Sequence, residues 1–182
     1  MRQAVPYHVQ MGGPGVGNLL VVCTGNAARS VMVRAMLTES QVPVDVRSAG
    51  THAIELQPMG QRTRGALRSV GIEPPFHLSH QMTPSDVDWA DLVVVMEPDH
   101  VAYVRRHFPA AADRTATLPY LVENLEPGDA PVRDRLAVLG LGTVPPHDQA
   151  SVADPAGGDE DAYLACAREL EILVKELALR LG

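Results

Sequence analysis

The sequence predicts a single-domain α/β protein in which a four-stranded parallel sheet is covered by helices on both faces and a long helix ends the chain. Short apolar runs of strand length alternate with segments of helical periodicity, which is the pattern of successive βα units. No two strand-like runs are joined by the two-residue turn of a hairpin, so a parallel sheet is favoured. The C-terminal segment repeats apolar residues at the spacing of an amphipathic helix packed on a core. These positions are Tyr163, Ala167, Leu170, Val174, Leu177 and Leu181.

The composition limits the classes of protein to consider. The chain has 182 residues, of which 46% are apolar and 20% charged, enough for one domain with a full core. Its net charge of −7 opposes general binding to nucleic acid. No run approaches the roughly 18 apolar residues of a membrane span, so no membrane association is expected. The two cysteines, Cys23 and Cys166, are too few for a disulfide framework and, with no secretory signal, indicate a reducing cytoplasm.

Two stretches stand apart from the alternating pattern. Residues 1–17 are rich in proline and glycine and have little apolar periodicity, which predicts a flexible leader before a domain at 18–182. The segment 122–153 is also rich in proline and glycine and is predicted as an insertion within that domain. One helix is compatible with its residues 132–139.

The first half of the domain contains two predicted strands and two predicted helices. The apolar run at 19–23 is expected to be a buried strand, and a helical pattern follows it over 30–40. A short strand is expected over 44–49. The next helix covers 58–70 and ends before Gly71, the residue type that best tolerates a left-handed exit from a helix.

The second half continues the alternation. The residues from Thr83 to Asp86 have the composition of a helix start, and an apolar strand follows over 91–96. Pro98, suited to a first helical turn, opens a helix that continues to Phe108. A last, short strand is expected over 115–118.

The most informative stretch lies between the first strand and the first helix. The strand delivers Cys23 into a loop of small residues, and Arg29 follows six positions later as the helical pattern begins. Five intervening residues are enough for a loop that curls around one tetrahedral oxyanion, with backbone N–H groups turned inward and the guanidinium clamping two oxygens. The loop residues are Thr24, Gly25, Asn26, Ala27, Ala28, Arg29 and Ser30.

The residue types of this loop suit a nucleophilic cysteine. A helix N-terminus and Arg29 both favour the thiolate form of Cys23. Gly25 permits close approach of the backbone to an anion, and Asn26 tolerates a left-handed conformation. Ser30 is placed to donate to the sulfur when it becomes a leaving group. A lone cysteine after an apolar strand is more often a core residue, but the combination of strand, cysteine, loop, arginine and helix favours a phosphoryl-transfer site.

This loop resembles the signature of the low-molecular-weight protein tyrosine phosphatase family. The run Cys23-Thr-Gly-Asn-Ala-Ala-Arg29-Ser30 matches the family motif in residue type and in its position after the first strand. The similarity extends over most of the chain outside the leader and the insertion. It includes Ser48-Ala-Gly-Thr51, Leu78-Ser-His80, Met96-Glu97-Pro-Asp99 and Asp154-Pro155.

The resemblance implies a role for each matching residue. Cys23 attacks phosphorus and carries a phosphocysteine intermediate, while Arg29 clamps the equatorial oxygens. Asp154 protonates the leaving group and then activates water, although Asp-Pro-Ala-Gly-Gly by itself is more typical of an ordinary turn. No metal or other cofactor is implied, because the loop and Arg29 supply the positive field. A network that holds the loop in shape is matched by Asn26, Ser30, Ser48 and His80.

The chain departs from the family pattern in three places. Ala28 stands where the family usually has a second cysteine, so a reversible disulfide within the loop is not available, and Cys166 is expected to pack in the core instead. Val31 replaces the usual proline. Ala156-Gly157 replaces the aromatic pair that often walls the slot for an aryl group, and Ile54 offers only apolar contact near the opposite wall.

The leading hypothesis is therefore a phosphatase that acts on phosphotyrosine in proteins or on small aryl phosphates and releases inorganic phosphate. A protein phosphoarginine phosphatase is the first alternative, because the missing aromatic pair leaves room for it. Relatives with that activity tend to carry threonine where Ala27 stands, which weighs against it. An arsenate reductase is disfavoured, because the segment 78–82 lacks further redox cysteines.

Two functions without catalysis by this loop are also considered. A phosphate-binding module that has lost catalysis is motivated by Ala28, Val31 and the altered residues after Asp154. A metal site is not predicted, because the histidines of His77-x-x-His80 and His147-Asp148 lack a clear third ligand.

Overall fold

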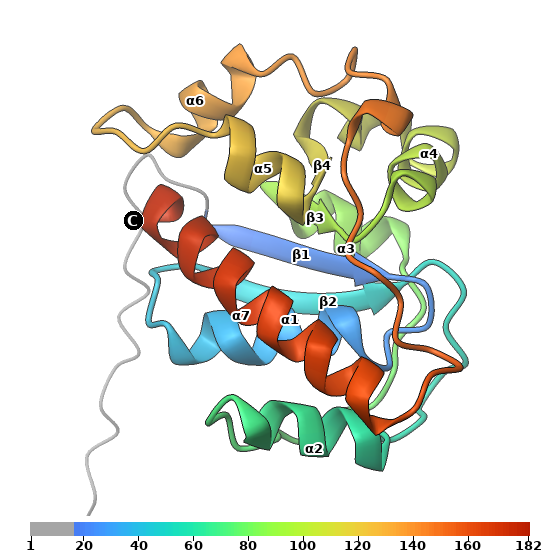
Figure 1. Cartoon of the computed structure of the whole chain (residues 1–182). Coiled ribbons are helices and arrows are strands. Elements are labelled where there is room, and N and C mark those ends of the chain that lie inside the picture. Colours follow the sequence, from blue (N-terminus) through green and yellow to red (C-terminus); the bar gives the residue numbers. More distant parts are fainter. Residues whose placement is uncertain (1–16) are drawn as a thin grey trace, which may run out of the picture.

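The computed structural model describes residues 17–182, which form a twisted parallel sheet between two layers of helices (Figure 1). The sheet has four strands in the order β2-β1-β3-β4. Their bounds are β1 Asn18–Cys23, β2 Asp45–Gly50, β3 Leu92–Val95 and β4 Thr115–Thr117. All neighbouring strands are parallel, and in the register of β1 with β2 Cys23 lies opposite Gly50. The predicted fold class is confirmed.

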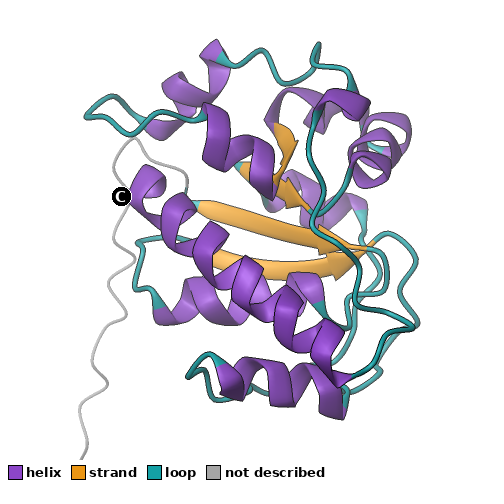
Figure 2. Ribbon diagram, in the orientation of Figure 1, coloured by secondary structure: helices purple, strands orange, loops and turns teal. Residues whose placement is uncertain are grey.

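Both faces of the sheet are covered, which is why β1 and β3 are apolar almost throughout. Side chains alternate along β1, so Leu19 and Val21 pack in one core cluster, and Leu20 and Val22 pack in the other. The first face carries α1 Arg29–Glu39, α2 Gln61–Ser69, α5 Leu118–Asn124 and α7 Glu160–Leu181 (Figure 2). The second face carries α3 Pro84–Trp89 and α4 Pro98–His107.

The predicted helix over 58–70 is shorter in the structure, because its first residues are extended. Pro58 forms an isolated antiparallel bridge with Leu78, so α2 begins only at Gln61. The helix start predicted at Thr83 is confirmed, since Thr83 caps α3 and forms a capping box with Asp86.

The long C-terminal helix is confirmed. It packs against α1, α2 and α5, and lies across the front of the sheet in Figure 1. The predicted apolar stripe is buried except for Tyr163, which is partly exposed and packs at the edge of the core. The buried residues of α7 are Cys166, Ala167, Leu170, Val174, Leu177 and Leu181.

The segment predicted as an insertion contributes to the core. It contains α6 Val132–Val138, as expected, and a 3-10 turn at Pro146–Asp148. The preceding α5 and the 3-10 helix Pro109–Arg114 are not among the predicted elements. Core side chains from this region include Leu125, Val132, Leu136, Leu141 and Val152.

Two further predictions concern the leader and membranes. The predicted leader, residues 1–17, lies outside the described residues except for Gly17. Within the described part of the chain, no helix is both long enough and apolar enough to cross a membrane.

Candidate active site

The loop between Cys23 and Arg29 lies at the carboxyl edge of the sheet, where parallel α/β proteins bind their ligands. It is tied to the turn after β2 by two backbone hydrogen bonds, in which Thr51 donates to Cys23 O (2.9 Å) and His52 donates to Thr24 O (2.9 Å). The approach is close, because a Cβ at Gly50 would lie 2.6 Å from the carbonyl oxygen of Thr24. A glycine is therefore required at the end of β2.

Asn26 shapes the middle of this loop. Its φ of 49° is left-handed, as the sequence predicts for this residue. Its side chain is fully buried, where the amide nitrogen donates to Ser30 Oγ (3.0 Å) and the amide oxygen accepts from the backbone N–H of His80 (2.9 Å). Both the nitrogen and the oxygen of the Asn26 amide are therefore hydrogen-bonded, and these bonds hold the left-handed backbone in place.

The carbonyl groups of the loop are held by surrounding side chains. His77 Nε2 lies 2.8 Å from Asn26 O, and Thr63 Oγ1 donates to Ala27 O (3.0 Å). No hydrogen bond from the backbone N–H groups of residues 24–30 to another residue of 17–182 is present. These free N–H donors, together with the neighbouring Arg29, are suited to binding an oxyanion.

The thiol of Cys23 lies at the base of the loop. The residue is 3% exposed, and its Sγ is 3.1 Å from Ser30 Oγ. Because the Ser30 oxygen already accepts from Asn26, its own proton is free to donate to the sulfur. Ser30 therefore lies beside the Cys23 sulfur, where the sequence analysis places it.

Arg29 brings the remote Asp154 to the loop. The Arg29 side chain is 1% exposed, and its Nη2 lies 2.6 Å from Asp154 Oδ2. Its Nη1 lies 2.9 Å from Glu97 Oε2 and donates to Val152 O (3.1 Å). The Asp154 side chain is 40% exposed, so this carboxylate contacts both Arg29 and solvent. The structure thus gathers Cys23, Arg29 and Asp154 in one place.

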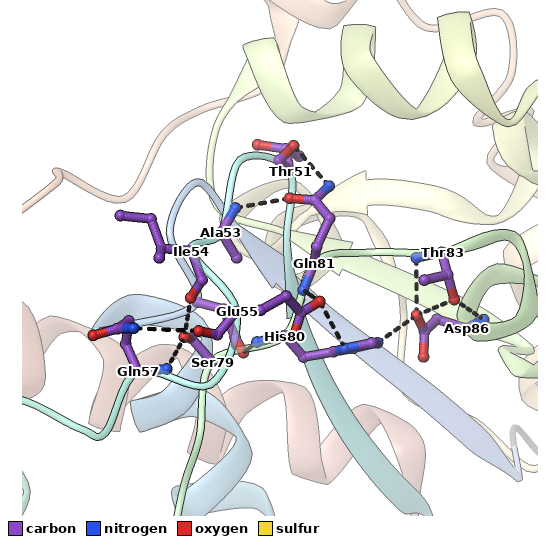
Figure 3. Close-up of polar contacts among 11 residues, drawn as sticks. Thr51, Ala53, Ile54, Glu55, Gln57, Ser79, His80, Gln81, Thr83 and Asp86 are labelled. Atoms are coloured by element: carbon purple, nitrogen blue, oxygen red, sulfur yellow. Dashed lines mark hydrogen bonds and ion pairs between the residues drawn. The ribbon is translucent and has the colours of Figure 1, made fainter.

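Two predicted support residues are placed differently from the expectation. The His80 side chain lies against Asp86 Oδ2 (2.9 Å) and Glu55 Oε1 (3.4 Å), as Figure 3 shows. Only the backbone N–H of His80 reaches Asn26. The Ser48 hydroxyl is buried and has no hydrogen-bond partner among the residues that the structure describes. Ser48 pairs with Val21, two residues before the edge of the sheet, which leaves it short of the loop.

A hydrogen-bonded wall, formed by residues 51–57 and 78–81, lies beside the loop. Figure 3 shows the turn after β2 joined to the segment before α3 by the side chain of Gln81, which accepts from Ala53 N (2.8 Å) and donates to Thr51 O (3.0 Å). Ile54 projects from this wall and is 75% exposed. It is therefore available for apolar contact with a bound molecule, as expected.

Sequence reasoning missed His77 as a support residue and treated it only as a weak metal candidate. Burial lowers the pKa of His77, so its imidazole is neutral near pH 7. His77 and His80 face different partners, and the region 17–182 holds no group of three His, Cys, Asp or Glu side chains suited to a metal. The motif Leu78-Ser-His80 was the available signal, but the sequence could not show which histidine faces the loop.

Glu97 and His100 were also missed as site residues. His100 lies in the first turn of α4, with Nε2 3.0 Å from Thr24 Oγ1 and 3.2 Å from Glu97 Oε1. Burial, aided by the nearby Arg29, lowers the pKa of His100 to about 4 despite the neighbouring carboxylates. The signal was the polar sequence directly after an apolar strand, at the edge of the sheet that carries Cys23.

Comparison with known proteins agrees with this arrangement. The model of the family described as low molecular weight phosphotyrosine protein phosphatase matches residues 18–139. A protein-arginine-phosphatase from Geobacillus stearothermophilus is 35% identical over 164 residues, which cover 90% of this chain and 95% of the relative. The low molecular weight protein-tyrosine-phosphatase Etp of Escherichia coli (strain K12) is 29% identical over 109 residues, 60% of this chain and 74% of Etp.

Solved structures show the same fold. The YwlE arginine phosphatase from Geobacillus stearothermophilus superimposes with a TM-score of 0.72 at 34% identity, covering 89% of this chain and 90% of that one. The tyrosine phosphatase Wzb from Escherichia coli K30 shares the fold with a TM-score of 0.74 at 22% identity, over 92% of this chain and 99% of its own. The sequence match, the fold and the cysteine–arginine loop agree, and this chain belongs to the low molecular weight phosphotyrosine protein phosphatase family.

Proposed function

We propose that this phosphatase removes phosphoryl groups from proteins through a covalent phosphocysteine on Cys23. The observation that carries the proposal is the convergence of the Cys23 thiol, the free N–H groups of its loop, and the Arg29–Asp154 pair at one edge of the sheet. Each is a component that phosphoryl transfer through sulfur requires.

The first chemical step forms a sulfur–phosphorus bond. The Cys23 thiolate attacks phosphorus while the loop N–H groups and Arg29 hold the three equatorial oxygens, over which the charge of the transition state is spread. The bond from phosphorus to the leaving atom breaks, and Asp154 delivers its carboxyl proton to that atom. A phosphate oxygen has to take over the Arg29 Nη2 donor that Asp154 occupies, which releases Asp154 for this role.

The second step regenerates the thiolate. Asp154 accepts a proton from water as the water oxygen attacks phosphorus, and the sulfur–phosphorus bond breaks. Ser30 stabilises the departing sulfur through its hydroxyl proton, and inorganic phosphate leaves. The positive field for both steps comes from Arg29 and backbone dipoles, so the proposed reaction needs no metal ion.

Phosphotyrosine in proteins is the first candidate substrate, with the exposed Ile54 as an apolar contact for its ring. Phosphoarginine is the second. The observation that favours it is that relatives matched over 90% of this chain, from Geobacillus stearothermophilus and Bacillus subtilis (strain 168), bear the name protein-arginine-phosphatase. The small residues Ala156-Gly157 after Asp154 also leave that side of the site without an aromatic wall.

The test is a panel of an aryl phosphate, a phosphotyrosine peptide and a phosphoarginine peptide. We expect Cys23→Ser to abolish turnover of whichever substrate is cleaved, and Cys166→Ala, the matched control, to retain it. Asp154→Asn should lower kcat by about 10²–10⁴ for a poor leaving group. Chelation by EDTA should change nothing.

Two outcomes would contradict the proposal. Full activity in Cys23→Ser would remove the nucleophile from the mechanism. Binding of phosphate or vanadate with no turnover of any substrate would instead identify a non-catalytic phosphate-binding module.

The cellular setting is part of the same proposal. Both cysteines, Cys23 and Cys166, are free and buried, which suits a protein that works in a reducing cytoplasm. The proposed partners are phosphorylated proteins of that compartment.

A further inference from the structure

His100 connects the two ends of the phosphate loop. Its Nε2 lies 3.0 Å from the hydroxyl of Thr24, the first residue after the nucleophile, and 3.2 Å from Glu97 Oε1. The other oxygen of Glu97 is 2.9 Å from Arg29 Nη1 at the far end of the loop. A continuous series of contacts therefore runs from Thr24 through His100 and Glu97 to Arg29.

The chemistry of these partners determines where the imidazole proton is. A lone pair on Nε2 would repel the Glu97 carboxylate 3.2 Å away, so His100 Nε2 carries the proton and donates its hydrogen bond to the hydroxyl of Thr24 (3.0 Å). The lowered pKa keeps the ring neutral near pH 7, which leaves Nδ1 without a proton. Nδ1 is buried and has no hydrogen-bond partner within residues 17–182. All the polar contacts of His100 therefore pass through one atom.

Glu97 depends on this contact for its orientation. Its side chain is 27% exposed, so it has water as an alternative partner, whereas Arg29 is 1% exposed and has none. His100 Nε2 is the contact that the structure gives Glu97 Oε1 within the described chain. Without it, the carboxylate is free to turn toward solvent and to leave Arg29 Nη1 with only the carbonyl of Val152.

We propose that His100 is a positioning residue for oxyanion binding, an inference that rests on the proposed phosphatase function. The charge contact of the His100 Nε2–H (3.2 Å) orients Glu97, and Glu97 occupies one edge of the Arg29 guanidinium so that the remaining donors face the phosphoryl group. The same N–H fixes Thr24 at the start of the loop. His100 acts through these residues and does not touch the substrate.

Two amide variants distinguish the role of Nε2 from that of Nδ1. The amide nitrogen of His100→Gln can reach the place of Nε2, whereas that of His100→Asn reaches only the place of Nδ1, which has no partner. The probe is inorganic phosphate, measured by direct binding and by competition against an aryl phosphate. We expect His100→Asn to weaken phosphate binding and to raise KM by about tenfold, because it removes both the hydrogen bond to Thr24 and the polar contact with Glu97. His100→Gln should stay within about threefold of the unmodified protein.

A mutant cycle tests whether His100 acts through its two partners. The Thr24→Val/Glu97→Gln variant should weaken phosphate binding, and adding His100→Asn to it should cost less than about threefold more, because both partners of Nε2 are already changed. The rate at which iodoacetamide alkylates Cys23 should remain within about twofold in all variants, because the inferred role concerns the oxyanion and not the sulfur. A general loss of structure would change both readouts together.

Three results would overturn the inference. They are unchanged phosphate binding in His100→Asn, equal impairment of His100→Gln and His100→Asn, and a full His100→Asn effect in the Thr24→Val/Glu97→Gln variant. If His100→Asn does not fold, the variants Thr24→Val and Glu97→Gln each remove one partner of His100 instead. Normal phosphate binding in either variant contradicts the inference. Phosphate binding without turnover by the unmodified protein would overturn the proposed function alone. Failure of that protein to bind phosphate would overturn both.

Discussion

The polar side chains that shape the loop are almost completely removed from water. Asn26 and Ser30 are 0% exposed, and Arg29 is 1% exposed. Burying such groups is costly unless each is hydrogen-bonded or paired, and the contacts of Asn26, Ser30 and Arg29 meet that requirement. The loop is therefore rigid before any anion arrives, which lowers the cost of ordering donors around a phosphoryl group.

The buried His100 makes stability depend on pH. Its pKa is about 4 in the folded protein, compared with an ordinary value of 6.5, so the unfolded chain binds the proton first as the pH falls. The contribution of His100 to the free energy of unfolding is therefore fully present above about pH 6.5. It falls by about 3 kcal/mol as the pH drops to about 4. Burial lowers the pKa of His77 in the same direction, which adds to the loss.

We expect His100→Gln, which cannot titrate, to lose less stability than the unmodified protein over the same range. The measurement is urea unfolding at several pH values between about 4 and 7. His77 titrates in both proteins and so serves as the common background. Parallel loss of stability in both proteins would show that His100 does not have a lowered pKa.

At the scale of elements, the helix α7 closes one face of the sheet. Leu170 is fully buried in this helix, whereas Ile172, two residues later, is 65% exposed. Leu170 contributes to the core cluster that also contains Leu19, Val21 and Cys23 at the sheet, so the packing of α7 supports the floor of the site.

Substitution at these two positions should separate packing from helix formation. Leu170→Ala should lower the free energy of unfolding by about 2–5 kcal/mol, because it removes apolar contact and leaves a cavity. Ile172→Ala, the matched control on the same helix, should change it by less than about 0.5 kcal/mol. Urea unfolding of both variants measures the difference, and equal effects would contradict the observed orientation of α7.

The elements that the sequence predicted well are those whose apolar period is long or uninterrupted. The strands 19–23 and 91–96 and the stripe of α7 belong to this group, because burial of a whole strand or of one helix face leaves a repeating pattern. The start of α2 was missed because Pro58 pairs with Leu78, a partner distant in sequence. The short helix α5 has too few turns to show a period.

At the scale of the whole molecule, the two cysteines have different chemistry. Cys23 lies in the loop proposed to bind the phosphoryl group, whereas burial, aided by the nearby Glu169, raises the pKa of Cys166 to about 12 and keeps it a thiol. A thiol is a poor nucleophile toward an oxidised sulfur. With Ala28 in the loop, the described chain holds no reactive second thiol close to Cys23 to form a protective disulfide.

We therefore expect hydrogen peroxide to oxidise Cys23 to the sulfenic acid and then further, with incomplete recovery of activity by dithiothreitol. Cys166→Ala should behave identically. Ala28→Cys should increase the recovered fraction, because the new thiol can condense with the sulfenic acid and release water. Residual activity after peroxide and reductant is the measurement. Full recovery in the unmodified protein, lost in Cys166→Ala, would show that Cys166 protects the nucleophile.

The sequence by itself determined the parallel α/β class and the loop from Cys23 to Arg29, because both are written in residues that are neighbours along the chain. The family resemblance already named Asp154, but only the tertiary structure showed how it meets the loop and which other distant side chains hold the loop. Arg29 Nη2 meets Asp154 across 125 positions, and His77, not the side chain of His80, faces Asn26 across 51. A hydrogen bond depends on distances of about 3 Å and on direction, and these are set by how strands and helices pack, which spacing along the chain does not encode.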